Sequence, residues 1–203
     1  SKPFGINEFT KHLEYLVNNF PIVTLNEDLD ELNSKGLKIC LTFDDAYFDF
    51  YYYVYPLLKK YNIKAVLGIP TGFIRQTSTI DREERLNVCY PDGLEKENLQ
   101  NKTPLCTWDE IREMVASKHV VPASHSHTHL DLSKINVNLE QEVKYSKDIL
   151  EKELKGLNIS IDNFIYPYGR MDPYSHAFVM KHFKYAFRIG SAINKEIDQK
   201  SGL

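Results

Sequence analysis

The sequence has little cysteine and no long apolar run, and each shortage excludes a class of protein. Its 203 residues include three cysteines, Cys40, Cys89 and Cys106, without Cys-x-x-Cys spacing. This pattern excludes a disulfide framework and a thiolate zinc site, although Cys89 and Cys106 could pair in an oxidising compartment. No apolar stretch approaches the roughly 18 residues of a membrane span, so we expect no transmembrane segment.

An excess of charge of one sign is also lacking. The chain carries 25 basic and 28 acidic side chains, a net charge of -3, and no run is rich in lysine or arginine. A nucleic-acid partner is therefore not expected. No basic and apolar leader precedes Phe4. This predicts a cytoplasmic protein, or an extracytoplasmic one if a leader has been removed, since the chain begins with Ser1 and not with methionine.

Helical and extended patterns alternate along the chain. Apolar residues recur with helical spacing, or helix-capping residues occur, at 9–20, 27–36, 54–61, 107–115, 138–155 and from Pro173. Short apolar or alternating runs between them predict strands at 21–25, 37–43, 64–69, 119–123, 163–166 and 184–189. Strands separated by helices indicate an α/β fold with a parallel sheet, open or closed into a barrel. The length fits one domain over residues 1–203.

One long segment stands outside this alternation. Residues from about 75 to 105 are polar and show no sustained period. An insert of this length in a compact domain is typical of a lid or binding loop, and a plain surface excursion is the alternative.

Polar side chains follow three of the predicted strands. Asp44 and Asp45 follow the strand at 37–43. Three histidines at alternating positions, 125, 127 and 129, follow the strand at 119–123, and the sequence YPYG occupies residues 166–169 at the end of another. Because the carboxyl ends of parallel strands form the functional edge of such folds, we expect these clusters to converge.

The residue types in these clusters indicate a metal site. One carboxylate and two neutral imidazoles suit Zn²⁺, Fe²⁺ or Co²⁺ and leave positions open for water and substrate. Spacing alone does not select the imidazoles, because all three histidines share one face of a strand whereas His125 and His129 stack on a helix. Of the adjacent Asp44 and Asp45, one can bind metal while the other acts as a base. A divalent metal acidifies water, which predicts hydrolytic chemistry.

Each cluster alone has a simpler explanation. An Asp-Asp pair after a strand is often a helix cap, and a histidine-rich stretch is often a solvated loop. Their joint occurrence in an alternating chain favours the metal site.

The sequence resembles a known family at three stretches. LTFDDAY (41–47), SHSHTHLDL (124–132) and FIYPYG (164–169) are similar, in this order, to the first three motifs of the polysaccharide deacetylases, also known as carbohydrate esterase family 4 or NodB-homology proteins. TWDEIREM (107–114) and KYAFRIG (184–190) also look typical, so the resemblance extends from about Phe4 to the end of the chain. It implies a distorted (β/α)7 barrel and metal-dependent hydrolysis of N-acetyl or O-acetyl groups on glycans.

The resemblance also implies roles for single residues. Asp44 matches the family's general base. Asp45, His125 and His129 match its ligands for one divalent metal, with zinc expected and cobalt, nickel or iron as alternatives. Tyr168 matches the residue whose backbone N–H, together with the metal, stabilises the oxyanion. Around them we expect residues that support the ligands or contact an acetylated glycan: His127, Tyr166, Pro167 and Arg170.

Three departures from the family pattern stand out. Ala46 replaces the usual glycine after the two aspartates, which adds a methyl group to the turn. Ile165 stands where many members have an arginine that orients the base, and Arg170 or Arg188 could substitute for it. The family's late Leu-x-x-His motif, which supplies a general acid, has no counterpart up to Leu203.

The sequence thus predicts a metal-dependent hydrolase that removes acetyl groups, N-acetyl foremost, from a glycan or its precursor. The alternatives are a catalytically silent carbohydrate-binding homologue and a hydrolase of another amide on the same fold. Because expulsion of an amine requires a proton and His176 is a poor candidate acid, we expect weak turnover of amides relative to aryl acetate esters. Most of the seven aromatic residues in 47–55 should pack in the core, with one or two able to stack on sugar rings.

Overall fold

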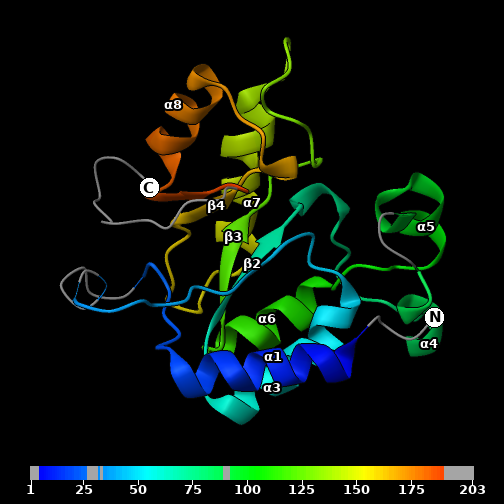
Figure 1. The fold of residues 1–203 in the computed structure, drawn as a ribbon. Coiled ribbons are helices and arrows are strands. Elements are labelled where there is room, and N and C mark those ends of the chain that lie inside the picture. Colours follow the sequence, from blue (N-terminus) through cyan, green and yellow to red (C-terminus); the bar gives the residue numbers. More distant parts are fainter. Residues whose placement is uncertain (1–4, 27–31, 33, 89–91, 190–203) are drawn as a thin grey trace.

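The architecture is a single sheet of parallel strands with helices packed around it. A computed structural model describes residues 5–26, 32, 34–88 and 92–189. Within these ranges, five strands form one sheet in sequence order, and every neighbouring pair is parallel (Figure 1). The parallel α/β architecture expected from the sequence is confirmed. The strands are β1 (Thr42–Phe43), β2 (Ala65–Ile69), β3 (Val120–Ser124), β4 (Asn163–Ile165) and β5 (Tyr185–Phe187).

At the β1 edge of the sheet, the strands are shorter than the sequence predicts. The runs at 21–25 and 37–43 pair with each other only through a parallel bridge between Ile22 and Ile39, and β1 keeps two residues of the second run. β2, by contrast, lies between β1 and β3 and is buried along its whole length. A continuous apolar run fits a central strand that is buried on both faces. Leu67 and Ile69 face the cluster that contains the helices, whereas Val66 packs against neighbouring strands.

Helices connect successive strands. Figure 1 shows α1, α3 and α6 grouped on one side of the strands, whereas α7 and α8 lie toward the other end of the sheet. None of the described helices is both long enough and apolar enough to cross a membrane. The longer ones are α1 (Ile6–Asn19), α3 (Tyr55–Tyr61), α6 (Trp108–Ala116), α7 (Ser146–Glu153) and α8 (Pro173–His182), with π-helical turns η1 (Phe50–Val54) and η4 (Glu140–Tyr145) leading into α3 and α7.

The starts of several helices follow the predicted caps. Thr107 and Glu110 form a reciprocal capping box at the start of α6. Asn138 accepts a hydrogen bond from the backbone N–H of Gln141 at 3.3 Å, just before η4. Most of the helix predicted at 27–36 lies outside the described residues, as does Cys89, which could pair with Cys106 only in an oxidising compartment.

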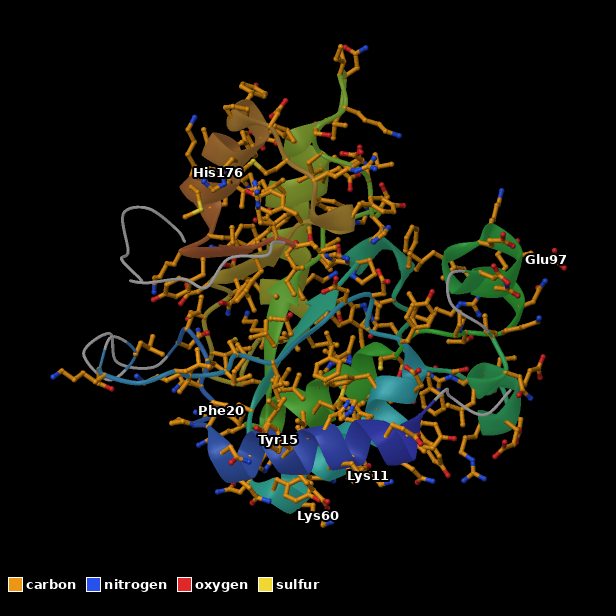
Figure 2. The ribbon with its side chains drawn as sticks, in the orientation of Figure 1. Lys11, Tyr15, Phe20, Lys60, Glu97 and His176 are labelled. Carbon is orange, nitrogen blue, oxygen red and sulfur yellow. The ribbon has the colours of Figure 1, made fainter. Side chains whose placement is uncertain are left out.

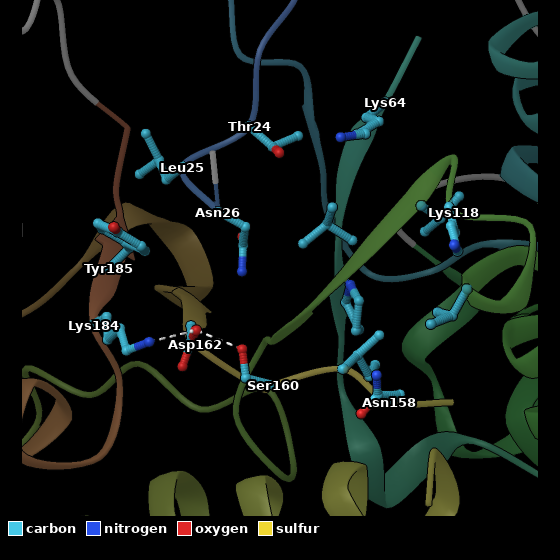
Figure 3. Close-up of a pocket in the computed structure, with 15 residues that line it drawn as sticks. Thr24, Leu25, Asn26, Lys64, Lys118, Asn158, Ser160, Asp162, Lys184 and Tyr185 are labelled. Atoms are coloured by element: carbon cyan, nitrogen blue, oxygen red, sulfur yellow. Dashed lines mark hydrogen bonds and ion pairs between the residues drawn. The ribbon is translucent and has the colours of Figure 1, made fainter. Parts of the chain in front are cut away.

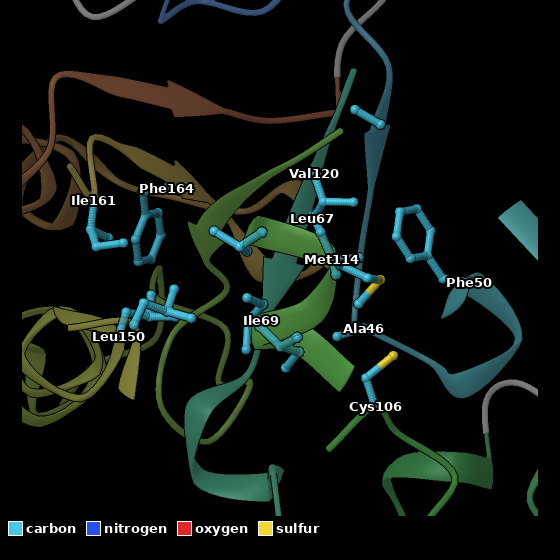
Figure 4. Close-up of a cluster of buried hydrophobic side chains, with 14 of the residues drawn as sticks. Ala46, Phe50, Leu67, Ile69, Cys106, Met114, Val120, Leu150, Ile161 and Phe164 are labelled. Atoms are coloured by element: carbon cyan, nitrogen blue, oxygen red, sulfur yellow. The ribbon is translucent and has the colours of Figure 1, made fainter. Parts of the chain in front are cut away.

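The core joins the sheet to these helices. Leu67 and Ile69 of β2 pack in one cluster with Met114 of α6, Leu150 of α7 and Phe164 of β4 (Figure 4). Full burial of one such side chain stabilises the fold by about 1.5–3 kcal/mol. The strands are therefore held rigidly, and the polar residues that follow them start from fixed positions.

The polar insert is anchored by one buried arginine. Arg85 donates to both carboxylate oxygens of Glu110, at 2.7 and 2.9 Å, and to the carbonyls of Thr103 and Leu105, both at 2.9 Å. Its guanidinium carbon lies 3.5 Å from the centre of the Phe48 ring. These contacts tie the insert to α6 and to the residues before it. Its short helices are α4 (Arg82–Leu86), η3 (Asp92–Leu94) and α5 (Lys96–Asn101). A role as a lid over a site stays a prediction.

Candidate metal centre

A left-handed turn after β1 separates the two aspartates. Asp45 has φ 65° and Ala46 has φ 53°, conformations that cost a non-glycine residue about 1–2 kcal/mol. The turn is held by a hydrogen bond from the N–H of Ala46 to the carbonyl of Asp44 at 2.9 Å, and by one from the N–H of Cys106 to the carbonyl of Ala46 at 2.7 Å. As a result Asp45 is buried at 6% exposure, whereas Asp44 is exposed.

The histidine segment leaves β3 and folds back on itself. His125 is buried directly after the strand, and Ser126 and His129 adopt left-handed conformations with φ 62° and 57°. These turns bring the rings of His125 and His129 together, with centres 4.8 Å apart. The Oδ1 atom of Asp45 lies 3.5 Å from Nε2 of His125 and 3.1 Å from Nε2 of His129.

The ligand atoms of Asp45, His125 and His129 all lie within 4.8 Å of one another, close enough to hold one ion. Zinc binds nitrogen and carboxylate oxygen at roughly 2.0–2.2 Å, which sets neighbouring ligand atoms about 3.0–3.5 Å apart. Oδ1 of Asp45 is buried and has no hydrogen-bond partner, although two imidazole nitrogens face it. Burial by itself raises the pKa of Asp45, but His125 and His129, when their Nε2 atoms carry a proton, outweigh it and hold that pKa well below its usual range. The carboxylate is therefore ionised and available to a cation.

The backbone fixes the tautomer of His125. Its Nδ1 lies 2.9 Å from the carbonyl oxygen of Ile165, and since a carbonyl only accepts, Nδ1 carries the proton. Nε2 is then unprotonated and directed at the cluster, as a metal ligand requires. Gly68 of β2 makes room for this ring, because a Cβ there would lie 3.3 Å from His125 and 3.2 Å from the side chain of Ile165.

His127 faces a different part of the molecule. Its Nδ1 lies 3.0 Å from the hydroxyl of Thr71, and its ring packs edge-on against Tyr145 with centres 5.0 Å apart. Its carbonyl accepts from the N–H of Gly72 at 2.7 Å, and a Cβ on Gly72 would lie equally close to that oxygen. Burial lowers the pKa of His127. A neutral His127 therefore braces the histidine segment against the loop after β2.

Glu142, which sequence reasoning missed, holds the same segment from the other side. This buried carboxylate on η4 accepts from the N–H groups of His127 and Thr128, at 3.2 and 2.8 Å, and from the Thr128 hydroxyl at 2.7 Å. The signal available in the sequence was its spacing, because Glu142, Ser146 and Leu150 lie four residues apart and all three are buried. An acid on a buried helix face needs such partners.

Asp44 stands beside the cluster as a second carboxylate. Partial desolvation by the surrounding wall raises its pKa, and Asp45 adds to the rise, while His125 and His129 oppose it. Ile165 provides no charged partner, and within the described ranges neither Arg170 nor Arg188 forms an ion pair with Asp44. In the part of the chain that the structure describes, neither arginine therefore takes the place of the family's arginine beside the base.

The YPYG segment divides between core and surface. Tyr166 is buried, its hydroxyl lies 2.9 Å from Nδ1 of His176, and burial raises its pKa. Figure 2 shows His176 on α8, where this contact ties it to Tyr166. Pro167 is buried as well. Tyr168, in a left-handed conformation with φ 59°, is 59% exposed and packs edge-on against the ring of His129, with centres 4.7 Å apart.

One pocket of the described chain lies away from these residues. It encloses about 490 Å³ and is lined by residues at the amino-terminal ends of the strands, among them Lys64 before β2 and Val120 at the start of β3. Within it, Lys184 pairs with Asp162 at 3.0 Å and Ser160 donates to the same carboxylate (Figure 3). None of the predicted site residues lines this pocket. The chemistry predicted from the sequence is therefore concentrated at the opposite ends of the strands.

Comparisons with known proteins agree with this geometry. Residues 32–187 match the family model described as polysaccharide deacetylase. A comparison with curated protein sequences gives no significant match.

Solved structures share the fold at low identity. A Bacillus anthracis protein described as a polysaccharide deacetylase has a TM-score of 0.74 and 21% identity, over 100% of this chain and 59% of its own. IcaB from Ammonifex degensii has a TM-score of 0.72 and 21% identity, over 97% of this chain and 80% of its own. A de-N-acetylase from Aggregatibacter actinomycetemcomitans has a TM-score of 0.71 and 21% identity, covering 98% and 85%. The distorted barrel expected from the resemblance is thereby confirmed, and the chain spans little more than half of the first of these proteins.

Proposed function

Because this chain belongs to the polysaccharide deacetylase family, we propose that it is a metal-dependent hydrolase that removes acetyl groups, N-acetyl foremost, from a glycan or glycan precursor. One observation carries the metal dependence. The buried Oδ1 of Asp45 lies without a hydrogen bond between Nε2 of His125 and Nε2 of His129. A buried, ionised oxygen in that position is costly unless a cation compensates it.

Asp45, His125 and His129 would hold one divalent ion, with zinc first and cobalt, nickel or iron as alternatives. Two nitrogens and one oxygen suit these metals and leave positions for water and substrate. When bound, the ion supplies Lewis acidity, which polarises the acetyl carbonyl and acidifies water. The His125 tautomer, set by the carbonyl of Ile165, supports this assignment.

The chain's own groups supply the remaining steps. Asp44, exposed beside the cluster, accepts the proton of the attacking water at its carboxylate. The backbone N–H of Tyr168 donates a hydrogen bond to the acetyl oxygen as negative charge develops on it. The ring contact between Tyr168 and His129 supports this role, because it keeps the YPYG segment beside the ligands.

The structure gives less support for a general acid that protonates the leaving amine. His176 contacts the buried hydroxyl of Tyr166, and His127 contacts Thr71, so both are engaged away from the cluster. The expected bias toward aryl acetate esters therefore stays a prediction. The alternative of a silent carbohydrate-binding homologue stays open for the same reason.

Acetate release tests the proposal. We expect the zinc-loaded or cobalt-loaded protein to release acetate from N-acetylglucosamine oligomers. We expect a chelator to abolish release and added metal to restore it, since the ion supplies the Lewis acid. Oligomer binding without any acetate release by the metal-loaded protein would support the silent homologue instead.

A further inference from the structure

A pocket adjoins the candidate metal centre on the side of His129. It encloses about 400 Å³, within the range of small-ligand sites. The ring of His129 and the exposed ring of Tyr168 form one wall, so a molecule bound here lies next to the proposed reaction centre. The other lining residues are Leu130, Asp131, Lys134, Val137 and Arg170.

A buried carboxylate organises the charged wall of this pocket. Asp131, 6% exposed, accepts from the N–H of Ser133 at 3.0 Å and from its hydroxyl at 2.6 Å. The carbonyl of Asp131 accepts from the N–H of Lys134 at 3.2 Å, which closes a turn. Nη1 of Arg170 donates to the remaining oxygen of Asp131 at 3.1 Å. Asp131 is therefore satisfied within the protein. Its carboxylate holds the guanidinium of Arg170, and its carbonyl holds the backbone of Lys134.

Both cations keep donors for a ligand. The side chain of Arg170 is 66% exposed and uses one nitrogen on Asp131. Lys134 is exposed on the rigid turn. The charges of Asp131 and Arg170 cancel, so Lys134 gives this wall of the pocket a net positive charge. An arginine held in this way presents a planar fork that matches a carboxylate.

We propose that this pocket binds a carboxylate on the sugar adjacent to the one that is deacetylated, so that the enzyme prefers an anionic glycan. The inference rests on the proposed function and narrows its substrate class. Tyr168 and Leu130 offer apolar surface to the sugar ring, while Arg170 and Lys134 receive its charge. The carboxylate could belong to a uronic acid or to a lactyl ether on the sugar.

The test compares matched oligosaccharides. Each pair contains the same N-acetylated sugar next to a neutral sugar or next to its carboxylate-bearing counterpart, with one pair for a uronic acid and one for a lactyl ether. Both kcat/KM for acetate release and Kd by calorimetry are measured on the metal-loaded protein. We expect a preference of about tenfold or more for one carboxylate-bearing member, the size of a hydrogen bond to a charged group. The preference should shrink as salt screens the charges.

Variants of the charged lining residues show whether the preference for a carboxylate arises in this pocket. Arg170→Gln should reduce the charged-to-neutral ratio about tenfold, and Lys134→Gln about threefold because its charge is solvated. Arg82→Gln is the control, since Arg82 is a similarly exposed arginine paired with Glu83 on α4; it should leave the ratio unchanged. If Arg170→Gln does not fold, the Lys134 variant still decides.

The outcomes separate this inference from the proposed function. Acetate release from both members with a ratio near one, or a ratio that survives Arg170→Gln and Lys134→Gln, overturns the carboxylate pocket and leaves the deacetylase proposal intact. A ratio in Kd that these variants abolish, without acetate release, upholds the pocket and overturns the proposed activity.

Discussion

At the scale of single residues, the site depends on how each side chain is turned. Adjacent aspartates point apart because Asp45 and Ala46 both take left-handed conformations. Three histidines at alternating positions do not share a face, since left-handed turns at Ser126 and His129 rotate the chain between them. The pair that reaches Asp45 is His125 with His129, and the backbone carbonyl of Ile165 leaves Nε2 of His125 as the ligand atom.

This geometry predicts different roles for two histidines of one segment. His129→Ala should reduce bound zinc to near background, because it removes one of three protein ligands. His127→Ala should keep near-stoichiometric zinc with an affinity lower by about tenfold, the effect of losing a supporting contact. Metal analysis after dialysis measures both. Stoichiometric zinc in the His129 variant would show that the ligand set is different.

At the scale of elements, the helices and strands that a local sequence pattern determines were predicted best. The runs at 64–69 and 119–123 became β2 and β3 because continuous apolar stretches fit central parallel strands. The runs at 21–25 and 37–43 kept little pairing, since their register depends on neighbours that no local pattern specifies. No local pattern indicated the left-handed conformations at Asp45 and Ala46, because neither residue is glycine; the one signal was the glycine that the family usually has in place of Ala46.

The histidine segment and the following helix act as one unit through Glu142. Replacing the carboxylate by a neutral amide in Glu142→Gln weakens the hydrogen bonds from the N–H groups of His127 and Thr128, and it puts an NH2 donor against the Thr128 hydroxyl, which donates to Oε1 of Glu142. We expect this to cost about 1–3 kcal/mol of folding stability and to weaken zinc binding by about 10–100-fold. Competition with a chromophoric chelator measures the zinc affinity, and thermal denaturation measures the stability.

The matched control is Glu153→Gln on α7. Glu153 is largely buried and pairs with Arg112 at 3.3 Å, but it does not contact the histidine segment. This variant should lose stability and keep its zinc affinity. The absorption spectrum of the cobalt-loaded protein should change only in the Glu142 variant. An unchanged affinity and spectrum there would limit Glu142 to a role in stability.

At the scale of the whole molecule, the parallel sheet separates two ends with different chemistry. The carboxyl ends of β1, β3 and β4 gather Asp44, Asp45, the histidines and the YPYG segment, and the polar pocket at the opposite ends holds none of them. The sequence predicted this convergence from strand order alone, because parallel strands present their carboxyl ends at one edge. It did not predict Glu142 or the Asp131–Arg170 pair, which depend on contacts between distant segments.

The proposed hydrolysis requires a metal held by three residues and a proton taken by a fourth. Asp44→Asn keeps the shape of the side chain and removes the proton acceptor. The decisive measurement is acetate release from an N-acetylglucosamine oligomer by this variant, with bound zinc determined on the same sample. We predict full zinc content and a rate lower by about 10²-fold or more than that of the parent protein. Full zinc content with release at the parent rate would contradict the assignment of Asp44 as the base.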